Sequence, residues 1–232
     1  MQLNNPDYRE LLIGAGRDHR KRYNAAPHHP RTWQSAKVVT LDVNKATNPD
    51  LWCDLNGQPP WWAAPRDPMG DESGIGPDIR ILKDSTPILP AYGVLHELVS
   101  DYWDEIHAYE VLEHLGRQGD AHAFFAQMSE LWRLLKPGGY LVCEVPSRFS
   151  GNLWGDPGHS RAIVEETLVF LDQSQYTLQC DGPEKSRTPM SDYRHVYKAD
   201  FKCTDHHDNR SHFAFVLQAV KPSRWNPPWA AV

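Results

Sequence analysis

The stretch from Asp120 to Val145 constrains the fold of this chain more than any other part of the sequence. Apolar side chains recur there at spacings of three and four residues, which predicts an amphipathic helix over Asp120 to Leu135: Phe124, Phe125, Met128, Leu131, Trp132 and Leu135. The run Lys136-Pro137-Gly138-Gly139 is typical of a helix end, and Tyr140 to Val145 predicts a buried strand. A helix followed at once by a buried strand favours an α/β fold.

Other segments extend this pattern along the chain. Short β-rich runs predict strands at 8–13, 37–41 and 104–109, and two further runs at 193–202 and 212–220 predict an antiparallel pair. Helical structure is expected at 89–103 and 161–172. Alternating strands and helices with a terminal strand pair predict an α/β fold with a Rossmann-like, doubly wound, mostly parallel sheet and a C-terminal antiparallel strand pair.

The length of 232 residues suits one domain spanning 1–232. Many of the 19 prolines and nine tryptophans cluster in an irregular insertion at about 56–90 and in a tail at 221–232. We expect the tryptophans of these segments to pack on the core or to meet a protein partner: Trp61, Trp62, Trp225 and Trp229.

The composition argues against several classes of protein. A net charge of −6 disfavours a surface that grips nucleic acid by charge, and no apolar run is long enough to cross a membrane. The N-terminus lacks the character of a signal peptide, and the four cysteines stand far apart. We therefore expect a cytoplasmic protein with reduced thiols.

Three predicted strands end in residues suited to ligand binding. Gly14-Ala15-Gly16 follows the first, and missing side chains at the glycines let a ligand approach the backbone. Asp42 follows the second, about 26 residues beyond Gly16, where such folds place an acid on ribose hydroxyls. Tyr109-Glu110 ends the strand at 104–109. In open α/β sheets these carboxyl ends form the ligand site.

Five blocks appear in the order found in class I S-adenosylmethionine-dependent methyltransferases: Leu-Leu-Ile-Gly-Ala-Gly (11–16), Val-Thr-Leu-Asp-Val (39–43), Asp-Leu-Asn (54–56), Asp-Glu-Ile-His-Ala-Tyr-Glu-Val-Leu-Glu-His-Leu (104–115) and Leu-Leu-Lys-Pro-Gly-Gly-Tyr-Leu (134–141). Over residues 8 to 146 the chain resembles this family, most of all the type 11 and related methyltransferases of bacteria and phages. The resemblance implies S-adenosylmethionine as cofactor, with its methionine part over Gly14, Ala15 and Gly16. It also implies that Asp42 binds the ribose, that Asp54 lies near the adenine amino group, and that Tyr109, with Glu110 beside it, approaches the cofactor.

Two positions depart from the family pattern. Leu12 stands where an acid is usual, two residues before the first glycine, and Asp18 stands where a glycine is usual. Whether Asp18 replaces the missing acid stays open. The absence of a third glycine also counts against a nicotinamide-binding fingerprint.

The acceptor side is expected after the strand at 140–145, where Asp156 and His159 stand in an Asp-Pro-Gly-His stretch. They are candidates to bind the acceptor or remove its proton, and an ordinary Asp-Pro turn is the alternative. Glu113 is assigned a structural or cofactor-side role, and His114 is a candidate catalytic residue exposed to the site. No metal site is expected, although Cys203, His206, His207 and His212 stand close in sequence.

The sequence thus predicts a methyltransferase acting on an oxygen or nitrogen of a small molecule, sugar or nucleotide. One alternative is a degenerate methyltransferase-fold domain serving as a structural or assembly component, for example of a phage particle, which would place it in the virion. A second alternative is a nucleic-acid methyltransferase, although the Asn/Asp-Pro-Pro-Tyr/Phe motif of amino-methylating enzymes is missing.

Overall fold

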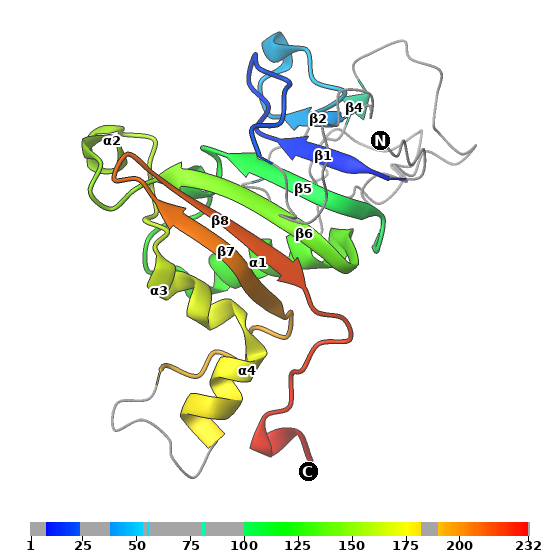
Figure 1. The fold of residues 1–232 in the computed structure, drawn as a ribbon, viewed down its shortest axis with the longest axis vertical. Coiled ribbons are helices and arrows are strands. Elements are labelled where there is room, and N and C mark those ends of the chain that lie inside the picture. Colours follow the sequence, from blue (N-terminus) through cyan, green and yellow to red (C-terminus); the bar gives the residue numbers. More distant parts are fainter. Residues whose placement is uncertain are drawn as a thin grey trace, which may run out of the picture.

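A computed structural model describes residues 8–23, 38–52, 55, 80–81, 100–181 and 190–231. At its centre lies an eight-stranded sheet with the order β4-β3-β2-β1-β5-β6-β8-β7 (Figure 1). The strands are β1 (Glu10–Ile13), β2 (Val39–Asp42), β3 (Leu51–Trp52), β4 (Arg80–Ile81), β5 (Trp103–Tyr109), β6 (Leu135–Pro146), β7 (Phe201–Asp208) and β8 (His212–Ala219).

The sheet is doubly wound. From β1 the chain proceeds through β2 and β3 toward one edge, and then returns to place β5 on the other side of β1. The pairs β1–β2, β2–β3, β1–β5 and β5–β6 are parallel, whereas β8 is antiparallel to both β6 and β7. This topology confirms the predicted fold class. The switch point of the sheet, where the strand order reverses, lies between β1 and β5.

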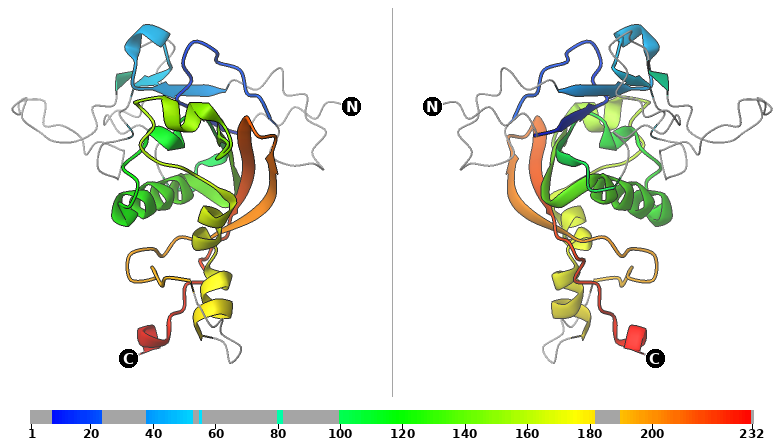
Figure 2. Two further views of the ribbon diagram at one scale, coloured as in Figure 1. Left: turned by 90° about the vertical axis from the view of Figure 1, so that its left-hand side faces the viewer. Right: turned by 90° about the vertical axis from the view of Figure 1, so that its right-hand side faces the viewer.

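The predicted amphipathic helix is present as α1 (Ala121–Leu134). It begins at Asp120, whose side chain accepts a 2.9 Å hydrogen bond from the backbone N–H of Ala123. Its apolar stripe, including the buried Leu131 and Leu134, packs on one face of the sheet (Figure 2). The larger hydrophobic core therefore lies on the α1 side of the sheet.

The run Lys136–Gly139 ends α1 as predicted, but it does not precede the next strand. It lies inside β6, because the pairing with β5 resumes after an interruption: Trp103 is opposite Leu135, and Glu105 is opposite Tyr140. The extra residues form a bulge, which Gly138 turns with a φ of +77°. The strand is consequently longer than the predicted 140–145.

The strand predicted at 193–202 is wrong, because residues 193–200 form turns and extended chain and β7 begins at Phe201. Their apolar side chains serve packing instead: the rings of Tyr193 and Tyr197 lie 5.0 and 4.8 Å from that of Phe125 on α1. The polar stretch 205–209 lies mostly in β7, which is exposed along the sheet edge.

The helix predicted over 161–172 is also shorter than expected. Residues 161–164 are extended, and α3 (Glu165–Leu168) follows, continued by a 3₁₀ turn (Val169–Leu171). The remaining elements are α2 (Gly151–Gly155), α4 (Gln173–Tyr176), a π-helical turn (Thr177–Asp181), and 3₁₀ turns at Lys45–Thr47, Leu112–His114 and Pro228–Ala231.

The C-terminal tail packs against the domain. Trp225 donates a 2.9 Å hydrogen bond from Nε1 to the carbonyl of Arg194, and the Arg194 guanidinium lies 5.2 Å from the ring of Trp229. Apart from β4, the predicted insertion at 56–90 lies outside the described residues, as do Asp54 and most of the helix expected at 89–103. Trp61 and Trp62 belong to this part of the chain. Within the described ranges, none of the helices is long and apolar enough to span a membrane.

Candidate functional site

The turn after β1 lies against the end of β2. The backbone N–H of Gly16 donates a 2.7 Å hydrogen bond to Oδ2 of Asp42, and Ala15 donates to the carbonyl of Leu41. Gly14 and Gly16 both have positive φ, +61° and +56°. A Cβ on Gly14 would lie 2.3 Å from Cγ2 of Val111, whereas no atom of the described residues lies within 4 Å of a Cβ on Gly16. Gly14 thus serves packing, and Gly16 borders open space.

Asp42 is nearly buried and holds two backbone groups. Besides Gly16, the N–H of Asn44 donates to it, at 2.7 Å from Oδ1. Each carboxylate oxygen retains further acceptor capacity. Asp42 therefore organises the glycine turn and can still accept a hydroxyl hydrogen bond.

Tyr109 holds the segment 17–23 against the sheet. Its hydroxyl accepts hydrogen bonds from the backbone N–H groups of Arg22 and Tyr23, at 3.2 and 3.3 Å, and lies 2.8 Å from Nδ1 of His107. Burial raises the pKa of Tyr109. The phenol is thus a neutral anchor for this segment.

A row of polar side chains continues this contact across β1, β5 and β6. Lys21 donates to Glu10 at 2.6 Å, Arg22 donates to Glu144 at 2.6 Å, and Tyr23 also donates to Glu144. Asp18, which the sequence offered as a substitute acid, instead bonds Arg20 at 2.8 Å on the surface. Leu12 is buried within the sheet.

His107 lies at the centre of this row. Its Nε2 lies 3.0 Å from Glu105 and 3.7 Å from Glu10. Burial favours the neutral ring, but the hydrogen bonds and charges of both glutamates outweigh it and raise the pKa of His107. Burial likewise works to raise the pKa of Glu105, yet its partners, led by His107, lower it to about 2. The network thus pairs the buried His107 with two glutamates.

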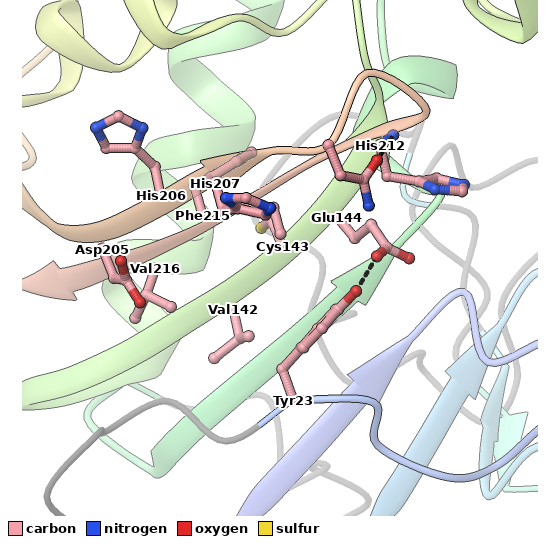
Figure 3. A pocket seen from close by; sticks show the side chains of 12 residues that line it. Tyr23, Val142, Cys143, Glu144, Asp205, His206, His207, His212, Phe215 and Val216 are labelled. Carbon is pink, nitrogen blue, oxygen red and sulfur yellow. Dashed lines mark hydrogen bonds between the residues drawn. The ribbon is translucent and has the colours of Figure 1, made fainter. Parts of the chain in front are cut away.

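A hollow over β6, β7 and β8 adjoins this segment (Figure 3). Tyr23 and Glu144 lie on one side of it, joined by a hydrogen bond, and His207 and His212 line it from the other strands. Nε2 of His212 lies 4.0 Å from Oε1 of Glu110, so the hollow reaches the carboxyl end of β5. Glu110 has a φ of +56°, and burial raises the pKa of its carboxyl group.

The candidate acceptor residues gather around Glu113. Nε2 of His114 and Nε2 of His159 each lie 4.0 Å from Oε1 of Glu113, and the two rings meet edge to face at 4.7 Å. Oδ2 of Asp156 lies 3.8 Å from Nε2 of His159. The side chains of His114 and Asp156 are 40% and 51% exposed, so the cluster opens to solvent on their side.

Backbone hydrogen bonds fix the loop 156–161 to the segment 113–120. The N–H groups of Ser160 and Arg161 both donate to the carbonyl of Glu113, at 2.8 and 3.1 Å. The buried Arg161 donates from Nη2 to the carbonyls of Arg117 and Asp120, at 2.6 and 2.9 Å. This attachment positions His159 beside Glu113, and it explains why residues 161–164 are extended rather than helical.

Burial makes Glu113 an unusual carboxyl group. The side chain is 0% exposed, and neither oxygen has a hydrogen-bond partner among the described residues. Burial, with smaller contributions from Glu110 and Asp156, raises its pKa to about 8. A carboxyl of this kind can hold or release a proton near neutral pH.

The structure therefore forms two groups from the predicted site residues. Gly14, Ala15, Gly16 and Asp42 meet at the ends of β1 and β2, and His114, Asp156 and His159 meet near the end of β5. Tyr109 and Glu110 lie between them at the end of β5, with the hydroxyl of Tyr109 already used by the segment 17–23.

Sequence reasoning underrated Glu113 and missed Arg161. The signal for Glu113 was an acid beside a histidine inside an apolar block, and the signal for Arg161 was a basic residue two positions after His159. Both depend on contacts between segments far apart in the chain, which a single sequence does not reveal.

No protein-family model and no curated protein matches this chain. Among solved structures, it is similar to an S-adenosylmethionine-dependent methyltransferase from Archaeoglobus fulgidus at 14% identity and a TM-score of 0.46, covering 92% of this chain and 87% of that one. It is also similar to a 16S rRNA (adenine(1408)-N(1))-methyltransferase from Catenulisporales acidiphilia at 13% identity and a TM-score of 0.40, covering 92% and 86%. A methyltransferase from Mesorhizobium loti matches at 13% identity and a TM-score of 0.39, covering 90% of each chain. At these values the fold assignment rests on the strand order and not on the matches.

Proposed function

We propose that this chain is an S-adenosylmethionine-dependent methyltransferase whose cofactor lies at the carboxyl ends of β1, β2 and β5. The observation that carries the proposal is the contact between the glycine turn and Asp42 at the switch point of the sheet, where no described atom lies within 4 Å of a Cβ on Gly16. Ligands of doubly wound sheets bind at this point. The ordered sequence blocks, which resemble those of class I methyltransferases, supply the identity of the cofactor.

Each residue of the cofactor side has a role in this proposal. The methionine part passes over Gly14, Ala15 and Gly16, where the missing side chain of Gly16 permits close approach. Asp42 accepts hydrogen bonds from the ribose hydroxyls with its remaining lone pairs. Asp54, outside the described residues, is assigned to the adenine amino group by the resemblance alone.

The acceptor enters on the side of Glu113, His114, Asp156 and His159. Methyl transfer needs the acceptor oxygen or nitrogen in line with the sulfonium methyl, so the main contribution of the protein is proximity and orientation. The imidazole of His159, or the neighbouring Asp156 or His114, takes the proton that the acceptor loses. The acceptor itself is a small molecule, sugar or nucleotide, in a protein that we place in the cytoplasm.

Calorimetric titration of the full chain with S-adenosylmethionine and S-adenosylhomocysteine tests the cofactor assignment. We expect each of these two ligands to bind with a stoichiometry of one molecule per protein chain. Asp42→Ala should weaken binding by about 10- to 100-fold, because a hydrogen bond to a charged group contributes about 1.5–3 kcal/mol and each 1.4 kcal/mol is tenfold in affinity.

Asp101→Asn is the matched control. Asp101 lies just before β5, at the opposite end of that strand, and pairs with Lys221. This variant should bind both ligands with unchanged affinity. Absence of binding by the parent chain would refute the enzymatic proposal and favour a degenerate domain with a structural role, whereas methyl transfer into bulk RNA or DNA would favour a nucleic-acid methyltransferase.

A further inference from the structure

The cluster around Glu113 holds a buried carboxylate without a partner among the described residues. Buried polar groups are nearly always hydrogen-bonded, and buried charges are paired or coordinate metals. Nδ1 of His159, a ring with 7% of its side chain exposed, is likewise buried without a partner. The unpartnered Glu113 carboxyl faces Nε2 of His159 at 4.0 Å, which leaves both atoms available to a ligand that completes the cluster.

The atoms that face one another in this cluster, imidazole nitrogens and a carboxyl oxygen, are of the types that bind metal ions in proteins. One ligand atom from each of Glu113, His114 and His159 lies within 4.8 Å of the other two, and Nε2 of each histidine is 4.0 Å from Oε1 of Glu113. Nδ1 of His114 lies 3.0 Å from the carbonyl of Gly158, to which it donates, so the lone pair of that ring is on Nε2, toward Glu113. Metal-binding histidines are held by such a bond from the second ring nitrogen.

We propose that Glu113, His114 and His159 bind one divalent transition-metal ion, with Asp156 beside its open side. Imidazole nitrogens and a carboxylate suit zinc, cobalt, nickel or iron. Ligands at about 2.0–2.2 Å from a tetrahedral ion lie about 3.3–3.6 Å apart. The observed separations of 4.0 Å from Glu113 to each histidine therefore need to contract by only about half an ångström when the ion binds.

Two other carboxylate–histidine clusters in the described residues are already neutralised by the protein. Lys21 pairs with Glu10 in the cluster that contains His107, and Arg22 pairs with Glu144 in the cluster that contains His212. The Glu113 cluster has no lysine or arginine ion pair within the described residues, and nearby Glu110 and Asp156 make it still more negative. Within the described residues, no lysine or arginine therefore competes with a metal ion for these ligand atoms.

The surrounding structure holds the ligands before an ion arrives. The loop 156–161 is bound through its backbone to the carbonyl of Glu113, and Arg161 fixes the next turn. His114 and Asp156, on the exposed side, leave a path for the ion and room for further ligands. Three protein ligands with an open position are the arrangement of catalytic metal sites.

One consequence rests on the proposed function. If the chain transfers methyl groups, the ion would polarise an acceptor oxygen and lower its pKa, and the ligating nitrogen of His159 would no longer be free to take the proton. Metal binding itself is tested without activity, so failure of the methyltransferase proposal would leave it standing.

The test is a titration of the EDTA-treated full chain with Co²⁺ and Zn²⁺, followed by calorimetry and by the visible absorption of bound Co²⁺. We expect one ion per chain, with Zn²⁺ displacing Co²⁺. Glu113→Gln and His159→Asn should each weaken binding by more than about 100-fold, since loss of groups that merely orient the ligands already costs about 10- to 100-fold. His122→Gln, at an exposed position on α1, should bind like the parent chain.

A second measurement identifies the ligands even if one variant is unstable. With Mn²⁺ bound, electron spin-echo modulation should report imidazole nitrogen at the ion, and the signal should weaken in His114→Gln and His159→Asn. Circular dichroism serves as the control that each variant is folded. The proposal is overturned if the parent chain binds no ion in stoichiometric amount, or if folded Glu113→Gln and His159→Asn keep full affinity.

Discussion

Substituting Gly14 by alanine separates the packing role of this turn from its role toward a ligand. The new Cβ would stand 2.3 Å from Cγ2 of Val111, whereas carbon atoms in contact lie about 3.5–4.0 Å apart. Overpacking of this kind costs about 1–3 kcal/mol, and the left-handed φ of +61° costs an L residue about 1–2 kcal/mol more. Gly14→Ala should therefore lower the free energy of unfolding by about 2–5 kcal/mol.

Gly16→Ala is the matched control, because it has a similar φ of +56° and an open Cβ position within the described residues. It should lose only about 1–2 kcal/mol. In the background of Val111→Ala the nearest remaining side-chain atom is Cβ at 3.5 Å, so adding Gly14→Ala there should also cost only about 1–2 kcal/mol.

Urea denaturation followed by circular dichroism measures the free energy of unfolding of the parent chain and of each variant. The double-mutant cycle should give a coupling of about 1–3 kcal/mol between positions 14 and 111. If Gly14→Ala costs no more than Gly16→Ala, or if Val111→Ala gives no relief, the close contact does not exist and Gly14 is required only by a ligand.

Three further predictions follow from buried groups. Arg161→Met should lower the free energy of unfolding by about 2–4 kcal/mol, because it leaves the carbonyls of Arg117 and Asp120 unpaired. The exposed Arg148→Met should lower it by less than about 0.5 kcal/mol. Equal losses in urea denaturation would contradict this difference. Because the pKa of His107 is raised in the folded state, the stability that protonated His107 contributes is complete below its unfolded pKa of about 6.5 and is lost as the pH rises through its folded pKa. The difference in the free energy of unfolding between the parent chain and His107→Gln should therefore narrow from pH 6 to 9. A difference that widens over this range would refute the network. Burial raises the pKa of the Cys143 thiol, so iodoacetamide at about pH 8 should label it only after unfolding, while mass spectrometry finds label on the partly exposed Cys180 and Cys203 of the native chain.

Sequence patterns predicted the centre of the fold well. Strands β1, β2 and β5 and helix α1 carry their own hydrophobic periodicity, so their existence is visible locally. The strand predicted at 193–202 failed because the apolar Tyr193 and Tyr197 pack on Phe125 without joining the sheet. Conversely, β7 is an exposed edge strand, and its polar side chains imitate a turn.

The part of the site whose residues directly follow consecutive strands could be predicted from the sequence. Gly14, Gly16 and Asp42 follow consecutive strands, so the topology alone brings them together. The approach of His159 to Glu113 was not predictable, because it depends on Arg161 and on backbone hydrogen bonds to 113–120. The hydrogen bonds from residues 22–23 to the Tyr109 hydroxyl were not predictable either, because the sequence of this segment has no apolar pattern that would place it on the sheet.

The polar row beneath residues 17–23 has a mechanical consequence. Adjacent residues of this segment form ion pairs with different strands: Lys21 pairs with Glu10 on β1, and Arg22 pairs with Glu144 on β6. Strand β5 lies between these two strands. Two strand spacings of about 4.8 Å are thus bridged by side chains in parallel with the backbone ladders. The four-residue β1 cannot leave the sheet without also breaking these side-chain ion pairs. We expect β1 and β5 to open together with β6 as one cooperative unit, visible as a shared rate of amide hydrogen exchange.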